Sequence, residues 1–152
     1  MEKVAILMGS KSDAPVMSVC ERYLRHFGIP YDTKISSAHR SPDETAEFAK
    51  TARESGYVCL IAAAGMAAHL AGALAAHSTL PIIGVPLEGS VLNGVDALYS
   101  TVQMPTGVPV ATMAIGKAGA ANAAIFAAQI LSLHSKEIQQ KLAEFKKKGS
   151  LL

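Results

Sequence analysis

Apolar runs and amphipathic stretches alternate along the chain. The apolar runs lie at residues 4–8, about 31–36, 58–63, 82–86 and 109–114, and helical spacing marks about 14–27, 42–55, 66–77, 94–103 and 118–147. This alternation predicts a parallel sheet with helices on both faces. The runs at 58–63 and 82–86 are apolar without alternation, as expected for strands that are buried on both sides. We therefore expect one three-layer α/β/α domain spanning residues 1–152.

Helix boundaries are marked by capping residues. Asp13 is an N-cap candidate for the first helix, with Pro15 in the first turn and Gly28 as the stop. Ser41 and Glu44 have the spacing of a capping box at the start of the second helix. The segment from about 118 to 147 is expected to form a C-terminal helical extension with a break near His134.

The composition restricts the kinds of partner. The formal charge of +2 is too small to favour nucleic acid or a membrane surface. Half of the residues are hydrophobic and only 17% are charged, which is below the roughly 25% typical of soluble domains. So few charges for a small domain predict buried subunit contacts, and hence a homo-oligomer.

Two further features bear on compartment. Cys20 and Cys59 match no ligand spacing and lie in apolar patterns, which predicts buried free thiols in a reducing cytosol. Residues 58–76 contain one polar side chain, His69, and are long enough to span a bilayer. Two glycines interrupt this segment, so we interpret it as a buried strand, a turn and a buried helix. No signal peptide is visible at residues 1–10.

The loops after the first three predicted strands combine small residues with a few polar ones. They read GSKSD at 9–13, SSAHRS at 36–41 and AAGMAAH at 63–69. In parallel sheets of this kind, ligands bind beyond the carboxyl ends of the strands. We therefore expect the chemistry at that edge of the sheet.

The first loop favours an anion. Free backbone N–H groups at the start of a helix attract negative charge, and the hydroxyls of Ser10 and Ser12 can add hydrogen bonds. Asp13 is suited to accept from a ribose diol. The alternative is that Ser12 or Asp13 only caps the helix.

The second loop places Arg40 at a helix start, where a cation is unfavourable unless an anion offsets it. A phosphate held by Arg40 and the first loop would supply that anion. His39 is the side chain best able to pass a proton at neutral pH. Small neighbours such as Ser37 leave both long side chains reachable. The alternative is a solvated corner with two polar residues of no function.

The third loop has Gly65 in the turn and an alanine-lined helix after it, with His69 about one turn in. Small side chains allow backbone amides to approach a ligand and leave a narrow, dry cavity. By itself, His69 is more typical of a hydrogen-bonded core histidine. The histidines show no paired spacing for a metal ion.

Together the loops resemble one family. MGSKSD, SAHRSP, AAGMAAHLAG, LPIIGVP and VQMPTGVPVATMAIGKAGAANAA are similar to the class I N5-carboxyaminoimidazole ribonucleotide mutases of purine biosynthesis, once called phosphoribosylaminoimidazole carboxylase catalytic subunits. The resemblance implies a flavodoxin-like α/β/α sandwich that assembles as a cytoplasmic homo-octamer. It also implies a small-molecule nucleotide substrate, no metal and no organic cofactor.

The resemblance also implies site roles. Ser10 and Arg40 would bind the phosphate with help from Ser12, Asp13 would bind the ribose, and His39 would be the general acid/base. The remaining residues of the implied substrate site are Ser37, Ala64, Gly65, Met66, His69 and Leu70.

Two positions depart from the family pattern. The family usually has Gly-Gly where this chain has Gly65-Met66, so Met66 adds bulk near the expected cavity. The family also usually has Leu-Pro-Gly where this chain has Leu70-Ala71-Gly72. A related class that uses free CO2 tends to have lysine at the position of Arg40, so the arginine favours the mutase. Two alternatives are a non-enzymatic nucleotide-binding module and a serine hydrolase using Ser10 or Ser37. The hydrolase would lack a G-x-S-x-G elbow.

Overall fold

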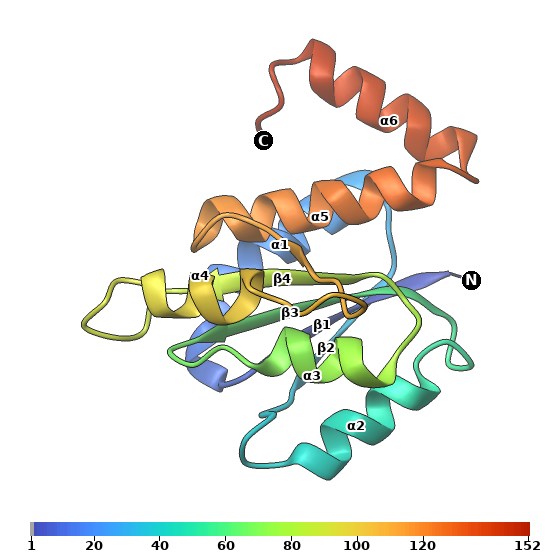
Figure 1. Ribbon diagram of the computed structural model, residues 1–152. Helices are drawn as coiled ribbons and strands as arrows, with labels where there is room; N and C mark the ends of the chain where they lie inside the picture. The colour runs from blue at the N-terminus through green and yellow to red at the C-terminus, as the bar shows by residue number, and fades with distance from the viewer. Residues whose placement is uncertain (1) are drawn as a thin grey trace.

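The computed structural model describes residues 2–152 and has three layers (Figure 1). Five parallel strands pair in the order β2-β1-β3-β4-β5. The strands are β1 (Lys3–Met8), β2 (Tyr31–Ile35), β3 (Tyr57–Gly65), β4 (Ile82–Leu87) and β5 (Ala111–Thr112). This order is that of the flavodoxin-like fold. The predicted single α/β/α domain with a parallel sheet is confirmed.

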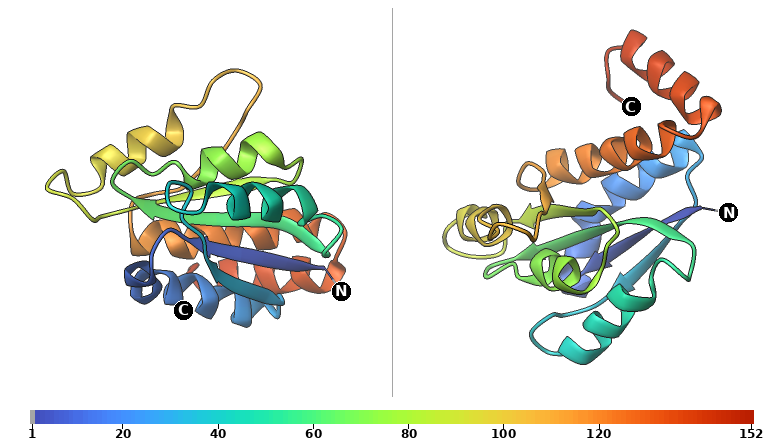
Figure 2. Two further views of the ribbon diagram at one scale, coloured as in Figure 1. Left: turned by 90° about the horizontal axis from the view of Figure 1, so that it is seen from below. Right: turned by 45° about the vertical axis from the view of Figure 1, so that its right-hand side comes forward.

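The helices cover both faces of the sheet. They are the short 3-10 turn η1 (Lys11–Asp13), α1 (Ala14–Phe27), α2 (Pro42–Thr51), α3 (Leu70–His77), α4 (Val95–Val102), α5 (Lys117–Ser132) and α6 (Lys136–Lys147). Helices α1 and α5 lie side by side on one face, and α2 and α3 lie on the other (Figures 1 and 2). Helix α6 packs outside the layer of α5.

Strand β1 shows why the sequences of the central strands are uninterrupted apolar runs. Val4 and Ile6 belong to the core that faces α1 and α5, whereas Ala5 and Leu7 belong to the core that faces α2 and α3. Successive side chains of a strand point to opposite faces of the sheet. Because both faces are covered by helices, the buried positions of the strand, Val4 to Met8, are all apolar.

The long C-terminal segment is two helices rather than one. Helix α5 ends at Ser132, and Ser135 caps α6 by accepting a hydrogen bond from the backbone N–H of Ile138. The possible break near position 134 is therefore confirmed. The buried alanines of α5 are short enough to let this helix lie close to α1 and the sheet; they are Ala120, Ala123, Ala124, Ala127 and Ala128.

Several predicted boundaries were wrong. The second helix ends at Thr51 instead of 55, and the last strand covers only Ala111–Thr112 of the expected 109–114. The third helix begins at Leu70 instead of 66, because a left-handed residue at Met66 keeps the chain out of helical geometry there.

The predicted capping box at Ser41 is also wrong. Ser41 occupies the N-cap of α2 but its side chain makes no capping hydrogen bond. Its hydroxyl donates instead to the carbonyl of Ser37, inside the preceding loop. The capping box lies in the first loop, where Ser10 and Asp13 satisfy each other's backbone N–H groups.

Both cysteines are buried and free, as predicted. Burial raises the pKa of the Cys59 thiol to about 12. Within residues 2–152, none of the helices combines the length and the apolar character needed to cross a bilayer. The apolar segment 58–76 forms strand β3, a turn and most of α3, as interpreted from the sequence.

Candidate active site

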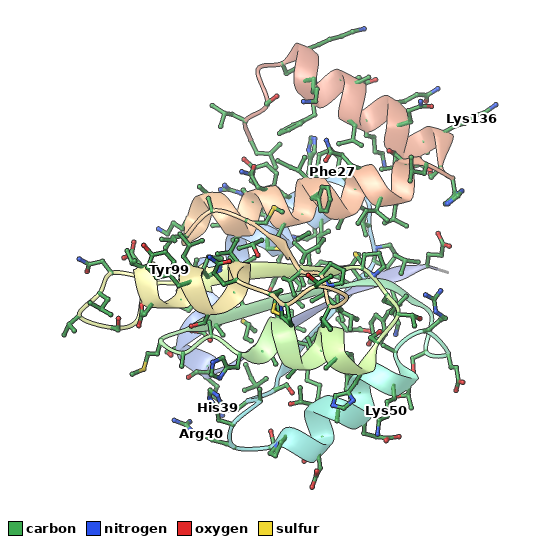
Figure 3. All side chains as sticks on the ribbon, in the orientation of Figure 1. Phe27, His39, Arg40, Lys50, Tyr99 and Lys136 are labelled. Atoms are coloured by element: carbon green, nitrogen blue, oxygen red, sulfur yellow. The ribbon has the colours of Figure 1, made fainter. Side chains whose placement is uncertain are left out.

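The loops that follow β1, β2 and β3 meet at one edge of the sheet. They enclose a pocket of about 670 Å³. Its lining residues are Gly9, Ser10, Ser12, Asp13, Ser37, His39, Arg40, Gly65, Met66, Ala67, Glu88 and Gly89. Figure 3 shows His39 and Arg40 together at this end of the molecule. The sequence prediction that three loops share one pocket is confirmed in its geometry.

The first loop is tied internally and to its neighbour. The Ser10 hydroxyl accepts from the backbone N–H of Ser12 at 3.3 Å and from the Ser12 hydroxyl at 3.0 Å. The backbone N–H of Ser10 donates to the Asp13 carboxylate at 3.0 Å, and that of Gly9 donates to the carbonyl of Ala63 in β3 at 3.0 Å. The loop is thus held in a conformation that keeps both hydroxyls at the pocket.

Asp13 is the titratable group that this environment perturbs. Partial burial raises the pKa of the carboxyl, and the hydrogen bond from the Ser10 backbone N–H opposes that rise without cancelling it. The carboxylate makes no capping bond to α1, although Asp13 precedes that helix. It instead accepts from the Ser10 backbone N–H as part of the capping box of η1, the turn that leads directly into α1.

The second loop presents Arg40 to the pocket without an acidic partner. Its backbone is fixed by a hydrogen bond from the Arg40 N–H to the Ser37 hydroxyl at 3.2 Å. The ion pairs found within residues 2–152 do not involve Arg40. Arg40 precedes the N-cap of α2 by one residue, and its guanidinium is available for an anion.

His39 is bound to a second histidine. Its Nε2 lies 2.7 Å from Nδ1 of His69, and the two rings are nearly perpendicular, with an angle of 81°. In such a contact one ring nitrogen must donate a proton and the other must accept. The sequence alone suggested that His69 is a hydrogen-bonded histidine of the core. It is hydrogen-bonded, but it is exposed at the N-cap position of α3 and is not a core residue.

The third loop contributes fewer lining residues than the sequence suggested. Gly65 and Met66 line the pocket, whereas Ala64, His69 and Leu70 do not. Ala64 packs against the core that faces α2 and α3, and Leu70 is buried in that core. Ala64 and Leu70 therefore anchor the two ends of the third loop to the hydrophobic core.

The loop after β4 also belongs to the pocket, although it was not predicted from the sequence. Glu88 and Gly89 line the pocket next to the third loop. A β-carbon on Gly65 would lie 3.3 Å from the carbonyl oxygen of Leu87 and 3.7 Å from Cα of Gly89, so the two turns approach closely through glycine. The Glu-Gly pair directly after a buried strand was the available signal, because it occupies the same edge as the other three loops.

The site combines an unpaired cation, three hydroxyls, two carboxylates and His39, whose ring contacts His69 outside the lining. Such a set can hold an anion and move a proton beside it. Residues 2–152 contain no group of three or more His, Cys, Asp or Glu side chains placed to hold a metal ion.

The comparisons with known proteins agree with this geometry. A parallel α/β sandwich with a polar pocket at the carboxyl ends of its strands defines a class of proteins that bind small molecules there. The family model described as AIR carboxylase matches residues 3–150. The chain belongs to the AIR carboxylase family.

Two sequence relatives share one name, and a solved structure shares the fold. The N5-carboxyaminoimidazole ribonucleotide mutase of Escherichia coli strain K12 is 52% identical over 145 residues, which cover 95% of this chain and 86% of that protein. The protein of that name from Bacillus subtilis strain 168 is 54% identical over 141 residues, or 93% and 87% of the two chains. The crystal structure of Treponema denticola PurE superimposes with a TM-score of 0.87 at 29% identity and covers 99% of this chain and 92% of that one.

Proposed function

We propose that this protein is an N5-carboxyaminoimidazole ribonucleotide mutase of purine biosynthesis, an intramolecular transferase. It converts N5-carboxyaminoimidazole ribonucleotide to 4-carboxy-5-aminoimidazole ribonucleotide. The proposal rests on one observation. Ser10, His39 and Arg40 line a single pocket, and 95% of this chain aligns at 52% identity with a protein of that name.

The nucleotide is anchored at its phosphate. Arg40 supplies an unpaired guanidinium, and the hydroxyls of Ser10 and Ser12 supply neutral donors on the facing loop. Asp13 accepts from the ribose hydroxyls, and Ser37 completes the substrate contacts between the first two loops. These residues fix the sugar phosphate, so that the imidazole ring is directed toward the third loop.

The reaction transfers a carboxyl group within one molecule. The bond between the exocyclic nitrogen and the carboxyl carbon breaks, the nitrogen takes up a proton, and CO2 is released inside the pocket. Ring carbon C4 then attacks CO2 and loses its own proton. Substrate and product are isomers, so the balance requires neither ATP nor an electron carrier.

His39 is the general acid/base of this scheme. One histidine can give a proton to the exocyclic nitrogen as the carboxyl group leaves and then accept the proton that C4 loses. The hydrogen bond to His69 holds the His39 ring in place beside the pocket. CO2 carries no charge, so the pocket retains it by shape, with Gly65 and Met66 at its surface and Ala64 and Leu70 behind them.

The chain forms a homo-oligomer in this proposal, an octamer by resemblance to the family, and works in the cytoplasm. Support comes from apolar side chains that the isolated chain leaves open on α4 and the segment before it. They are Val91, Leu92, Val95, Tyr99 and Val102, with exposed fractions of 96%, 57%, 42%, 63% and 48%. Sedimentation of the purified protein tests the assembly. A monomer at micromolar concentration would contradict it.

The activity is tested by supplying the N-carboxylated ribonucleotide to the purified protein with a chelator present and without ATP. We expect the ultraviolet absorbance of the C4-carboxylated isomer to appear. A parallel reaction with the decarboxylated nucleotide and bicarbonate separates the mutase from the class that uses CO2. Tight nucleotide binding without isomer formation would instead identify a binding module.

A further inference from the structure

Met66 adopts a backbone conformation that its side chain disfavours. Its φ angle is 57°, in the left-handed region. Six glycines of the described chain have positive φ, and within residues 2–152 the non-glycine residues that share it are Met66, Asn93 and Ser150. Asparagine tolerates this conformation through local hydrogen bonds of its side chain. Methionine has no such means, so this turn carries strain that glycine would avoid.

Folding of the chain does not offset that strain by burying the side chain. Met66 is 60% exposed and belongs to neither hydrophobic core, whereas Met8 and Met17 are 4% and 0% exposed. The apolar side chain therefore gains little within the isolated chain. A long apolar side chain in a strained, exposed turn points to a contact made outside the fold.

The position of Met66 indicates what that contact is. Met66 lines the pocket between Gly65 and Ala67, and Glu88 and Gly89 of the loop after β4 line it too. Among the described lining residues it is the only large apolar side chain. The phosphate and ribose find polar partners elsewhere in the pocket, but a flat heteroaromatic ring needs an apolar surface. A thioether packs favourably against such a ring.

We propose that Met66 packs on the imidazole ring of the bound nucleotide and so determines the preference of the pocket for a base-bearing ligand over a sugar phosphate. This inference rests on the proposed function, because the ring in question is that of the proposed substrate. Met66 contacts the ring and takes no part in proton transfer. The strain of the turn is the cost of presenting this side chain to the ligand.

The experiment compares two ligands that differ by the ring. Calorimetric titration measures the affinity of the wild-type protein, Met66→Gly and Met66→Leu for 4-carboxy-5-aminoimidazole ribonucleotide and for ribose 5-phosphate. Met66→Gly should weaken nucleotide binding about fivefold, in the range of a sulfur–aromatic contact. It should leave ribose 5-phosphate binding within about twofold, because that ligand has no ring to lose. Met66→Leu should retain most of the nucleotide affinity.

Ser150→Gly is the matched control. It removes a positive-φ side chain (φ 62°) near the C-terminus, outside the pocket. It should change neither affinity, and Met66→Gly should unfold at or above the wild-type temperature because glycine relieves the strain. Sedimentation of Met66→Gly should match the wild type.

Three results would overturn the inference: equal losses for the two ligands, no loss for either, or dissociation of the Met66→Gly oligomer, which would assign the side chain to a subunit contact. If the wild-type protein binds the nucleotide more tightly than ribose 5-phosphate but forms no isomer, the proposed function is contradicted and the Met66 contact is not. The effect of Met66→Gly on the affinities for the two ligands would still test that contact.

Discussion

Nε2 of His39 lies 2.7 Å from Nδ1 of His69, although the two residues come from different loops and are 30 positions apart. His39 lines the pocket and His69 does not. One of the two ring nitrogens donates to the other, so the orientation of His39 depends on His69. His69 is therefore a positioning residue for the proposed acid/base.

His69→Phe should lower kcat about tenfold and change KM little, because the ring of His39 loses its hydrogen-bonded orientation while the phosphate anchor remains. His69→Gln keeps a hydrogen-bonding group and should recover most of the rate. Steady-state kinetics of the isomerisation measure both. His77→Phe, at the exposed far end of α3, is the control and should behave as wild type. Equal rates for the Phe and Gln variants would contradict the positioning role.

His39→Asn should reduce turnover by at least about a hundredfold, the typical contribution of general acid/base catalysis. The affinity for the product nucleotide should stay within a few-fold of wild type, because the phosphate and ribose contacts are intact. Stopped-assay turnover and calorimetric titration separate the two effects. Full activity in this variant would show that the proton is carried by another group.

Arg40→Gln should weaken ribose 5-phosphate binding by about 10- to 100-fold, as expected for the loss of a charge-assisted hydrogen bond to a phosphate. KM should rise correspondingly. Arg22→Gln removes an exposed arginine on α1 outside the pocket and serves as the control. An Arg40 variant that binds ribose 5-phosphate as well as the control would place the phosphate elsewhere.

Asp13→Asn should stabilise the protein near neutral pH while weakening nucleotide binding. Partial burial raises the pKa of the Asp13 carboxyl in the folded state, so folding favours its protonated form. The wild type therefore loses stability as the pH rises through that raised pKa, whereas the Asn variant does not. The gain should vanish below about pH 3.9, where an unfolded Asp is itself protonated.

Urea unfolding of both proteins across this pH range provides the measurement. The stability difference should increase from acid toward neutral pH and then level off. A difference independent of pH would show that ionisation of Asp13 is not its cause. Proteins compared at different pH values must have the same assembly state, which sedimentation verifies.

The sequence was sufficient to predict the fold and the edge of the sheet that carries the pocket. Uninterrupted apolar runs such as 58–63 imply strands buried on both faces, and parallel strands place the loops that follow them at one edge. The meeting of Ser10, His39 and Arg40 follows from that topology alone. No side-chain detail was needed for it.

Other features depended on three-dimensional detail. The His39–His69 contact depends on the turn at Met66, whose left-handed backbone delays the start of α3 until Leu70. The hydroxyl of Ser41 could cap α2 or bond within its own loop, and spacing alone does not decide between them. These choices are made by tertiary packing, which local sequence patterns do not encode.

Two glycine-to-alanine substitutions in helices should have opposite effects. A β-carbon on Gly119 in α5 would overlap the backbone carbonyl of Ala114, so Gly119→Ala must displace the segment that leads into the helix. We expect a loss of about 1–3 kcal/mol in the free energy of unfolding. A β-carbon on Gly72 in α3 would lie 3.4 Å from Sδ and Cε of Met104, the mobile end of a flexible side chain. Gly72→Ala should therefore gain up to about 1 kcal/mol from helix propensity. Urea unfolding at one chain concentration measures both, and a loss of similar size in the two variants would mean that Met104 is held as rigidly as the backbone at Ala114.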